Sequence, residues 1–441
     1  MKNLYPKILI FSQPFSTLSG GGITLTNLYS EWPEDKLAVI SYPHMLSQIS
    51  TEHCKTYYQL GYEELHWTFP FSLIKEKHRS GLINAIPIEA GPSKKTSNSI
   101  RNIISTSLLN PLLKWLGLVH AISILQISDR MAAWLDKYAP DLLYFQISNR
   151  ESIRFALELI EFLKIPSVIH MMDDWPSTLC SKCVLKFYWG TKIDKEFRRL
   201  LNKVDLHLSI CDEMSSEYNG RYGHHFIPFH NTIDLGKWST FIRKDISPNN
   251  GSKIILFSGR IGTGIKQSLF ELADAVDKVR ARGIDARLHI QSPKIDSSLA
   301  GKLNQYNSVV INPIIEYSDI PRLYATADIL VIANDFSQSG VQFLRYSMPT
   351  KAPEYLISGT PILVYASSET ALYKLFHSNK LGHCVVSQEQ EELSAGIKLL
   401  LSDLEYRKTL SKNAVAFAVE NFDSRKVRSQ FQNLLKETAQ K

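Results

Sequence analysis

Two cations flank a glycine-containing loop near the middle of the chain. Arg260 and Lys266 lie on either side of this loop, just after an apolar run that ends at Phe257. We predict a strand, the loop and then a helix, and the start of a helix presents free N–H groups to an anion. The forked guanidinium of arginine and the point charge of lysine suit a pyrophosphate. The spacing fits two solvated surface cations equally well.

A second polar group lies around residues 350–359. Either Pro349 or Pro353 is predicted to lie in the first turn of a helix, with Thr350 as its cap and Gly359 at its end. Lys351 could meet a phosphate, and Glu354 could accept two hydrogen bonds from a ribose diol. Alternatively, Glu354 only complements the helix dipole, which is worth about 0.3–1 kcal/mol.

Three consecutive glycines, Gly20, Gly21 and Gly22, lie between the first apolar run and a predicted helix. Glycine allows the backbone to approach a ligand closely, and the helix start favours an anion. Neither the dinucleotide pattern G-x-G-x-x-G nor a P-loop G-K-[ST] is present. The structural alternative is a flexible turn.

A histidine and two carboxylates end another apolar run. His170, Asp173 and Asp174 are predicted to face a crevice, where the histidine could act as a general base or orient a substrate. A lone histidine at a strand end is more often structural. Because no third carboxylate lies at ligand spacing, we expect no metal site.

The cysteines are sparse and odd in number. Cys180 and Cys183 form a lone C-x-x-C without the second pair that structural zinc needs, so we interpret them as ordinary thiols. This usage favours a reducing compartment.

The elements that must position these residues alternate along the chain. Apolar runs of strand length separated by helix-length segments are typical of parallel sheets covered by helices. They are Lys7–Phe11, Asp141–Phe145, Ser167–Met172, Leu206–Ile210, Lys253–Phe257, Ala286–Ile290, Val309–Ile311, Ile329–Ile332 and Pro361–Tyr365. A polar segment over Gly236–Lys253 divides two such halves. Ligands of doubly wound sheets bind at the carboxyl ends of the strands.

The length allows two or three globular domains. The 441 residues are 44% hydrophobic and 21% charged, which excludes collagen-like, coiled-coil and disordered classes. The net charge of +7 permits an anionic substrate, a nucleic acid or a membrane surface. The first 15 residues lack the cleavage site of a signal peptide. Polar residues interrupt the apolar stretch Ile103–Ile127, so we predict no membrane span.

Two segments combine basic and apolar residues. Residues 105–127 place apolar side chains on one helical side, and residues 181–205 interleave lysines and arginines with Phe187, Tyr188 and Trp189. Such mixtures are typical of peripheral membrane contacts. The alternative for each is a helix with a core-facing side and a solvated basic side.

Together, these segments resemble the retaining glycosyltransferases of the GT-B fold, in particular glycosyltransferase family 4. The resemblance covers nearly the whole chain and rests on the order and spacing of the motifs. They are SGGG, LSICDEMSSEYNGRYGHHFIPFHNTIDLGKW with Asn231 and Asp234 at matching places, SGRIGTGIKQ, LYATADILVIAND, PTKAPEYLISGTPILV and RKTLSKNAVAFAVENFDSRKV.

The resemblance implies an α/β fold with two Rossmann-like, doubly wound domains facing a central cleft. Residues 1–240 would bind the acceptor and residues 252–415 the nucleotide-sugar donor. Residues 416–441 would form a C-terminal helix that packs back on the first domain.

The implied reaction is transfer of a sugar to an acceptor hydroxyl with retained anomeric configuration. By match, Arg260 and Lys266 hold the donor pyrophosphate and Glu354 binds the ribose. Gly21 and Gly22 contact the phosphates and the donor sugar. Cations that stabilise the leaving group make a metal or other cofactor unnecessary. Thr350 and Lys351 complete the expected donor site, and His170 and Asp173 the expected catalytic set.

Two positions depart from the family pattern. The first Glu of the E-x7-E motif is replaced by Tyr346, and the active-site His by Met172, with His170 two residues earlier on the same strand face. Either His170 substitutes, or Asp173 orients the substrate alone.

The expected role is synthesis of bacterial surface polysaccharide (capsule, lipopolysaccharide or exopolysaccharide). The enzyme would act in the cytoplasm, at the inner membrane face, on a sugar or lipid-linked glycan. The alternatives are a nucleotide-sugar 2-epimerase of the same fold and a non-catalytic nucleotide-sugar binding protein. A nucleic-acid partner is disfavoured, since the basic residues form no recognisable module.

Overall fold

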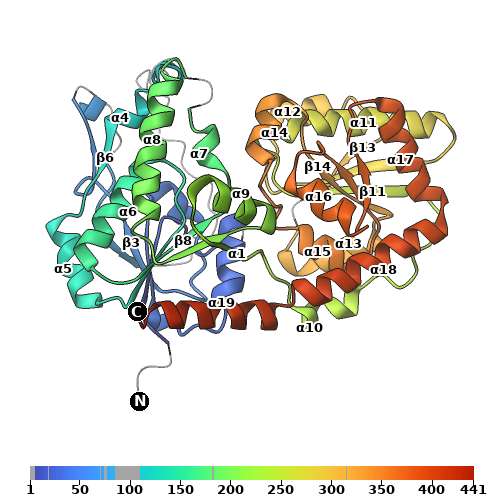
Figure 1. The fold of residues 1–441 in the computed structure, drawn as a ribbon. Coiled ribbons are helices and arrows are strands. Elements are labelled where there is room, and N and C mark those ends of the chain that lie inside the picture. The colour runs from blue at the N-terminus through green and yellow to red at the C-terminus, as the bar shows by residue number, and fades with distance from the viewer. Residues whose placement is uncertain are drawn as a thin grey trace. The chain divides into compact units, whose positions relative to one another are not determined.

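The computed structural model describes residues 5–17, 19–69, 71–73, 77–84, 110–180, 183–313 and 315–441. The chain divides into two units (Figure 1). The first comprises Met1–Phe229 and Ser429–Lys441, and the second comprises His230–Arg428. Each unit has its own sheet between layers of helices.

The first unit is built on an eight-stranded sheet of order β10-β9-β8-β7-β1-β2-β3-β5. Its strands are β1 (Ile8–Phe11), β2 (Leu37–Ser41), β3 (Thr56–Gln59), β5 (Gly81–Asn84), β7 (Leu142–Phe145), β8 (Ser167–Met171), β9 (Leu206–Ser209) and β10 (Phe226–Pro228). All neighbours pair in parallel except β3 and β5, which are antiparallel. A small antiparallel pair joins β4 (Leu65–Trp67) to β6 (Ser123–Leu125).

Helices connect and cover these strands. They are α1 (Gly20–Tyr29), α3 (Asn110–Leu116), α4 (Val119–Ile122), α5 (Asp129–Tyr138), α6 (Arg150–Leu163), α7 (Trp175–Thr178), α8 (Lys186–Leu201) and α9 (Asp212–Tyr222). Short 3-10 helices cover Glu34–Lys36, Pro43–Gln48 and Phe71–Leu73. Helix α6 shows why such segments are helical: Asn149 and Ser152 form a capping box at its start, and an apolar side that includes Ile153 and Phe155 is buried.

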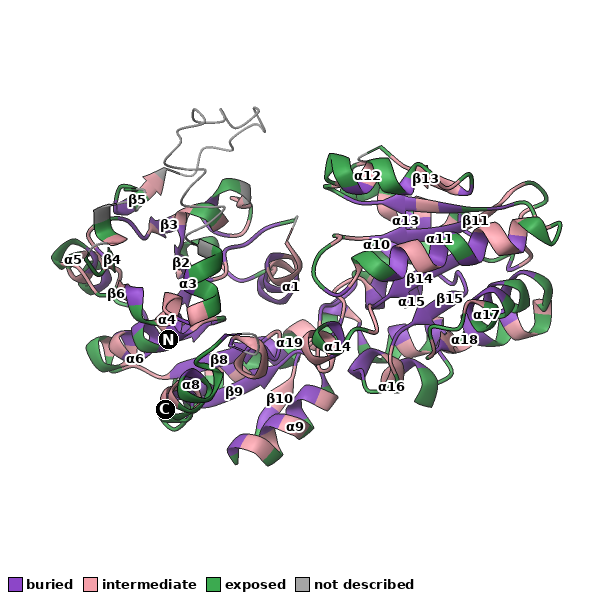
Figure 2. Ribbon diagram, turned by 90° about the horizontal axis from the view of Figure 1, so that it is seen from above, coloured by how far each residue is buried: buried purple, intermediate pink, exposed green. Residues whose placement is uncertain are grey.

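The second unit has a six-stranded parallel sheet of order β13-β12-β11-β14-β15-β16. Its strands are β11 (Lys253–Ser258), β12 (Ala286–Gln291), β13 (Val309–Ile311), β14 (Ile329–Ala333), β15 (Ile362–Tyr365) and β16 (His383–Val385). The central strands are buried beneath helices (Figure 2), which explains their unbroken apolar sequences.

The helices of the second unit are α10 (Leu235–Trp238), α11 (Lys266–Ala281), α12 (Ser297–Leu303), α13 (Ile320–Thr326), α14 (Gln338–Leu344), α15 (Ala352–Ile357), α16 (Ala371–Ser378), α17 (Gln390–Ser402) and α18 (Leu404–Asn421). Short 3-10 helices cover Ser239–Phe241 and Tyr317–Asp319. The predicted strand–helix alternation with parallel sheets is confirmed in both units.

The last helix, α19 (Ser424–Thr438), carries the chain back to the first unit. There the Phe431 ring is fully buried against Tyr29, Tyr144 and Phe229, at centroid distances of 5.2, 6.2 and 5.3 Å. The side chain of Gln432 donates to carbonyl oxygens at the end of α1. The first unit is therefore assembled from both ends of the chain.

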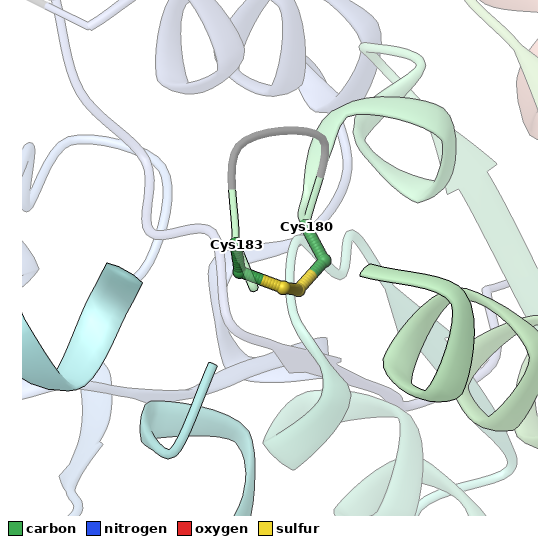
Figure 3. The surroundings of a disulfide bond; sticks show 2 residues. All are labelled: Cys180 and Cys183. Carbon is green, nitrogen blue, oxygen red and sulfur yellow. A yellow bond between two sulfur atoms is a disulfide. The ribbon is translucent and has the colours of Figure 1, made fainter. Parts of the chain in front are cut away.

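Cys180 and Cys183 form a disulfide bond in the structure, as Figure 3 shows. The turn after α7 brings them together, with the N–H of Cys183 donating to the carbonyl of Cys180 at 3.2 Å. The interpretation of these residues as ordinary thiols is therefore wrong, and this pair gives no argument for a reducing compartment. Cys54 and Cys211 are buried free thiols.

None of the helices in the described part of the chain is long and apolar enough to cross a bilayer. Residues 103–109, the start of the apolar stretch considered above, lie outside the described residues.

Candidate functional site

The end of β11 and the start of α15 lie against each other in the second unit. Lys351, just before α15, donates from Nζ to the carbonyl oxygen of Ser258 at the end of β11. Gly259 follows with a φ of +146°, and a Cβ atom there would lie 2.9 Å from that Nζ. Both the backbone conformation and the close approach of Lys351 therefore favour glycine at this position.

Lys351 has an unusual environment for a cation. Its Nζ lies 4.2 Å from the ring centroid of Phe257 and 5.4 Å from that of Tyr355, so it faces two aromatic rings. Burial lowers the pKa of Lys351 to about 7, although the nearby Glu354 acts to raise it. An anion bound at Nζ would favour the charged form and raise this pKa.

Glu354, in the first turn of α15, is almost fully buried. Its Oε1 accepts a hydrogen bond of 2.5 Å from the hydroxyl of Tyr317. Burial raises the pKa of Glu354 to about 7, while the Tyr317 bond and Lys351 act to lower it. A buried carboxylate with one donor in place retains capacity to accept further hydrogen bonds, as from a diol.

The sequence reasoning missed Tyr317. It lies in the 3-10 helix after β13, and 37 positions separate it from Glu354. Its only sequence signal is an aromatic residue soon after the end of a strand.

Two tyrosines fix the end of β11. The hydroxyl of Tyr355 accepts from the N–H of Ser258 at 3.0 Å, and the hydroxyl of Tyr324 donates to the Ser258 side chain at 3.1 Å. Their rings meet edge to face at 4.9 Å. The backbone that faces Lys351 is thus held by buried hydrogen bonds.

Arg260 and Lys266 lie on the loop between β11 and α11, and both are exposed. Lys266 begins α11, and its Nζ is 3.4 Å from a carboxylate oxygen of Asp296. Both partners are about half exposed, so this ion pair contributes little to stability and can be exchanged for a ligand. Asp335 accepts from the N–H of Ser268 at 2.8 Å and so caps the start of α11.

Thr350 does not cap α15, contrary to the prediction. The residue at the cap position is Lys351, and no side chain accepts a hydrogen bond there. Thr350 instead presents its carbonyl oxygen to the side-chain amide of the buried Asn231, at 2.7 Å. Of the two candidate prolines, Pro353 lies in the first turn and Pro349 precedes the helix. Gly359 follows the helix with a φ of +74°, as predicted.

Gly21 and Gly22 begin α1 in the first unit, where Ser19 caps the helix by accepting from the N–H of Gly22 at 3.2 Å. A Cβ atom at Gly22 would lie 2.6 Å from the Ser16 Cβ, and one at Gly21 2.8 Å from Oε1 of Gln13. Packing alone therefore favours glycine at Gly22, whereas the close contact of Gly21 is with the end of the flexible Gln13 side chain.

His170 lies in β8 and is fully buried. Its Nδ1 is 2.7 Å from the Tyr144 hydroxyl, and its Nε2 is 3.3 Å from the carbonyl oxygen of Ser209. The Gln146 side chain donates to the same hydroxyl at 3.1 Å. With both ring nitrogens paired across neighbouring strands, the geometry favours a structural role over the predicted catalytic one.

The two aspartates after β8 differ. Asp174 is buried and accepts from Arg221, Tyr218 and Ser177, which joins this turn to α9. Asp173 is partly buried and is the one of the pair with side-chain exposure left for a ligand. In the described residues, no group of three His, Cys, Asp or Glu side chains could hold a metal ion.

One family model matches most of the second unit. Residues 239–417 match the family model described as Glycosyl transferases group 1. No curated protein matches the sequence.

Solved structures are similar over nearly the full length. Sucrose-phosphate synthase from Thermosynechococcus elongatus has 14% identity and a TM-score of 0.59 over 98% of both chains. Anabaena Alr3699/HepE, in complex with UDP and glucose, has 14% identity and a TM-score of 0.61 over 98% of this chain and 100% of its own. An E. coli structure, described as trehalose-6-phosphate bound with UDP-2-fluoro glucose, has 11% identity and a TM-score of 0.59 over 97% of this chain and 98% of its own. The predicted GT-B fold, with parallel sheets in two Rossmann-like domains, is confirmed.

Proposed function

We propose that the protein is a retaining glycosyltransferase that moves a hexosyl group from a nucleotide-sugar donor to an acceptor hydroxyl. The observation that carries the proposal is the placement of Lys351, which contacts the end of β11, three residues before the buried Glu354 of α15, in the unit that matches Glycosyl transferases group 1. A site for a nucleoside diphosphate needs a cation that binds the phosphates and an acceptor that binds the ribose diol. Lys351 and the buried carboxylate of Glu354 would supply these two groups.

UDP is the nucleotide that we propose for the donor. Anabaena Alr3699/HepE was solved with UDP-glucose, and the E. coli protein with UDP-2-fluoro glucose. In this chain Glu354 would accept from the ribose hydroxyls. Arg260, Lys266 and Lys351 would bind the pyrophosphate, with Thr350 beside them.

The mechanism that follows is front-face substitution. The bond between the anomeric carbon and the donor phosphate oxygen breaks, and the acceptor oxygen attacks from the same face. The leaving phosphate accepts the proton of the acceptor hydroxyl, so no base from the protein is required. Arg260 and Lys266 stabilise the charge that develops on the departing diphosphate. These cations do the electrostatic work for which other enzymes use a metal ion, and we propose no cofactor.

The first unit would bind the acceptor, a sugar or a lipid-linked glycan. The resemblance assigns Gly21 and Gly22 to the donor phosphates and sugar, and Asp173 to orientation of the substrate. We assign His170 to support of the strand beneath Asp173. Synthesis of bacterial surface polysaccharide at the inner membrane face is the role that we propose.

Titration and turnover of matched variants test this function. Arg260→Ala and Lys266→Ala should each lower transfer from a UDP-sugar by about 100-fold or more, as removal of a single charge-stabilising donor does elsewhere. The controls are Arg287→Ala in β12 and Lys302→Ala in α12, both exposed cations of the same unit. Wild-type turnover in both site variants would overturn the proposal.

A second assay separates the two alternative functions. UDP-sugar is incubated with the protein alone, and the sugar is examined by NMR. Interconversion of the sugar without acceptor would identify an epimerase. Binding of UDP with neither hydrolysis nor transfer to any lipid-linked acceptor would identify a binding protein.

A further inference from the structure

Two basic and apolar segments that are 70 residues apart in the sequence meet on the first unit. The N–H of Val184, just before α8, donates to the carbonyl oxygen of Trp115 in α3 at 2.7 Å. Gly117 follows α3 with a φ of +75°, and a Cβ atom there would lie 2.6 Å from the Trp189 ring. The turn after α3 is therefore pressed against α8, and Figure 1 shows α4 close to the start of α8.

A buried arginine holds the two segments in place. Arg150 donates to both carboxylate oxygens of Glu196 in α8, at 2.7 and 2.6 Å, and to the carbonyl of His120 in α4, at 2.6 Å. Its guanidinium also lies 5.3 Å from the Trp189 ring centroid. The Cys180–Cys183 disulfide closes the turn that leads into the second segment. Buried contacts therefore fix the two segments against each other.

Large apolar side chains on these segments face solvent. Six of the fourteen exposed large hydrophobic residues in the described part of the chain lie within residues 112–115 and 184–188. We call the exposed surface of the two segments the apolar–basic patch. It consists of Leu112, Lys114, Trp115, Val184, Leu185, Lys186, Phe187 and Tyr188, together with the partly buried Lys192, which contacts Tyr188. A cluster of this kind marks an interaction site.

The charged residues within the two segments are all of one sign. Residues 110–128 and 175–193 contain no aspartate or glutamate, but they contain four lysines. Lys186 lies 5.0 Å from the Phe187 ring centroid, and Lys192 donates to the hydroxyl of Tyr188 at 3.1 Å. Aromatic rings with lysines beside them match the boundary between lipid headgroups and acyl chains.

We infer that the apolar–basic patch docks the first unit onto an anionic lipid bilayer. Phe187 and Trp115, exposed by 80% and 57%, would enter the interface, while the lysines contact anionic headgroups. The inference joins into one surface what the sequence presents as two separate segments. It requires no glycosyl transfer, so it can be tested without donor or acceptor.

Vesicle co-sedimentation of the full chain tests the inference. The probe is vesicles of phosphatidylcholine with 30% phosphatidylglycerol, compared with pure phosphatidylcholine. We expect binding to the anionic vesicles that weakens with salt. Trp115→Ser with Phe187→Ser should weaken it at least ten-fold. Lys114→Gln with Lys186→Gln should weaken it about 25-fold, or about five-fold per lysine.

The controls change the same residue types away from the patch. They are Phe162→Ser and Lys137→Gln. Phe162 lies at the end of α6 that is far from Arg150, Lys137 lies in the last turn of α5, and both residues are exposed. Neither should affect binding, and UDP titration should be unchanged in every variant. Failure of UDP binding in the wild type would count against the proposed function and leave the vesicle result standing.

Three results would overturn the inference. One is no binding to anionic vesicles at low salt. Another is equal loss of binding in patch and control variants. The third is a dimer in solution that the Trp115 and Phe187 changes dissociate, because the occupant would then be a second copy of the chain.

Discussion

Substitution of Glu354 should stabilise the second unit and weaken nucleotide binding at the same time. An isolated carboxyl in an unfolded chain has a pKa near 4.5, whereas burial raises the pKa of Glu354 to about 7. Between these values the folded state holds a proton that the unfolded state has released. Stability is therefore lost as the pH rises from about 4.5 to about 7, and the full loss persists above that pH.

The size of this loss follows from the two pKa values. A difference of about 2.5 corresponds to roughly 3.4 kcal/mol at high pH, and to roughly 1.4 kcal/mol at pH 5.5. Glu354→Gln keeps an oxygen that can accept from Tyr317 and cannot ionise. The free energy of unfolding of the variant, relative to that of the wild type, should therefore rise by about 2 kcal/mol between pH 5.5 and pH 8. For a unit of this size, this corresponds to roughly 4–8 °C in Tm.

Calorimetry of wild type and variant at the two pH values measures this change. Glu405→Gln, whose parent carboxylate is 83% exposed, is the matched control and should show no such growth. A Tm difference that stays constant with pH would refute the reasoning about burial. In parallel, UDP titration at pH 8 should show affinity at least ten-fold weaker, since a hydrogen bond to a charged group is worth about 1.5–3 kcal/mol. Unchanged affinity would remove Glu354 from the ribose site.

Three further predictions concern other contacts. Tyr317→Phe removes the hydrogen bond that lowers the pKa of Glu354, so the loss of UDP affinity on acidification should begin at a higher pH. UDP titration over a range of pH measures this, and the same pH dependence as in the wild type would contradict it. His170→Ala should lower the free energy of unfolding by roughly 2–4 kcal/mol, as measured by denaturation. The turnover per folded molecule should stay within a few-fold of the wild type, and a large loss of turnover in fully folded protein would support a catalytic role for His170. Cys180→Ser with Cys183→Ser opens a loop of only four residues, so urea denaturation should show a loss of about 2 kcal/mol, and a much larger loss would mean that the bond orders more than its own turn.

The strands, and some of the residues that begin or end helices, could be predicted from the sequence. Strands such as β11 and β14 are buried on both faces, and a buried face leaves an apolar run that is visible without a structure. Gly359 and Pro353 were predictable for the same kind of reason, because their backbone preferences are properties of the residue itself.

Contacts between distant residues were not predictable. The Tyr317 bond to Glu354 spans 37 positions, and the bond from Lys351 to Ser258 spans 93. His170 was expected to face a ligand because it lies near a strand end, but its neighbours on β7 and β9 supply partners for both nitrogens. Which side of a buried strand meets a ligand depends on the packing of the whole sheet. Thr350 did not become a cap, because α15 begins one residue later, with Lys351 at the cap position.

The burial of Lys351 and Glu354 links the stability of the second unit to the proposed binding of a nucleotide. Burial lowers the pKa of Lys351 and raises that of Glu354, so each charged form is disfavoured where it is. A phosphate near Lys351 would restore its charge, and a ribose diol would solvate the carboxylate of Glu354. In the proposed site, a bound nucleotide would therefore supply to both residues the interactions that water supplies in the unfolded chain. Relief of these two unfavourable burials would then contribute to the binding free energy, so removing either charge should improve stability and impair binding together.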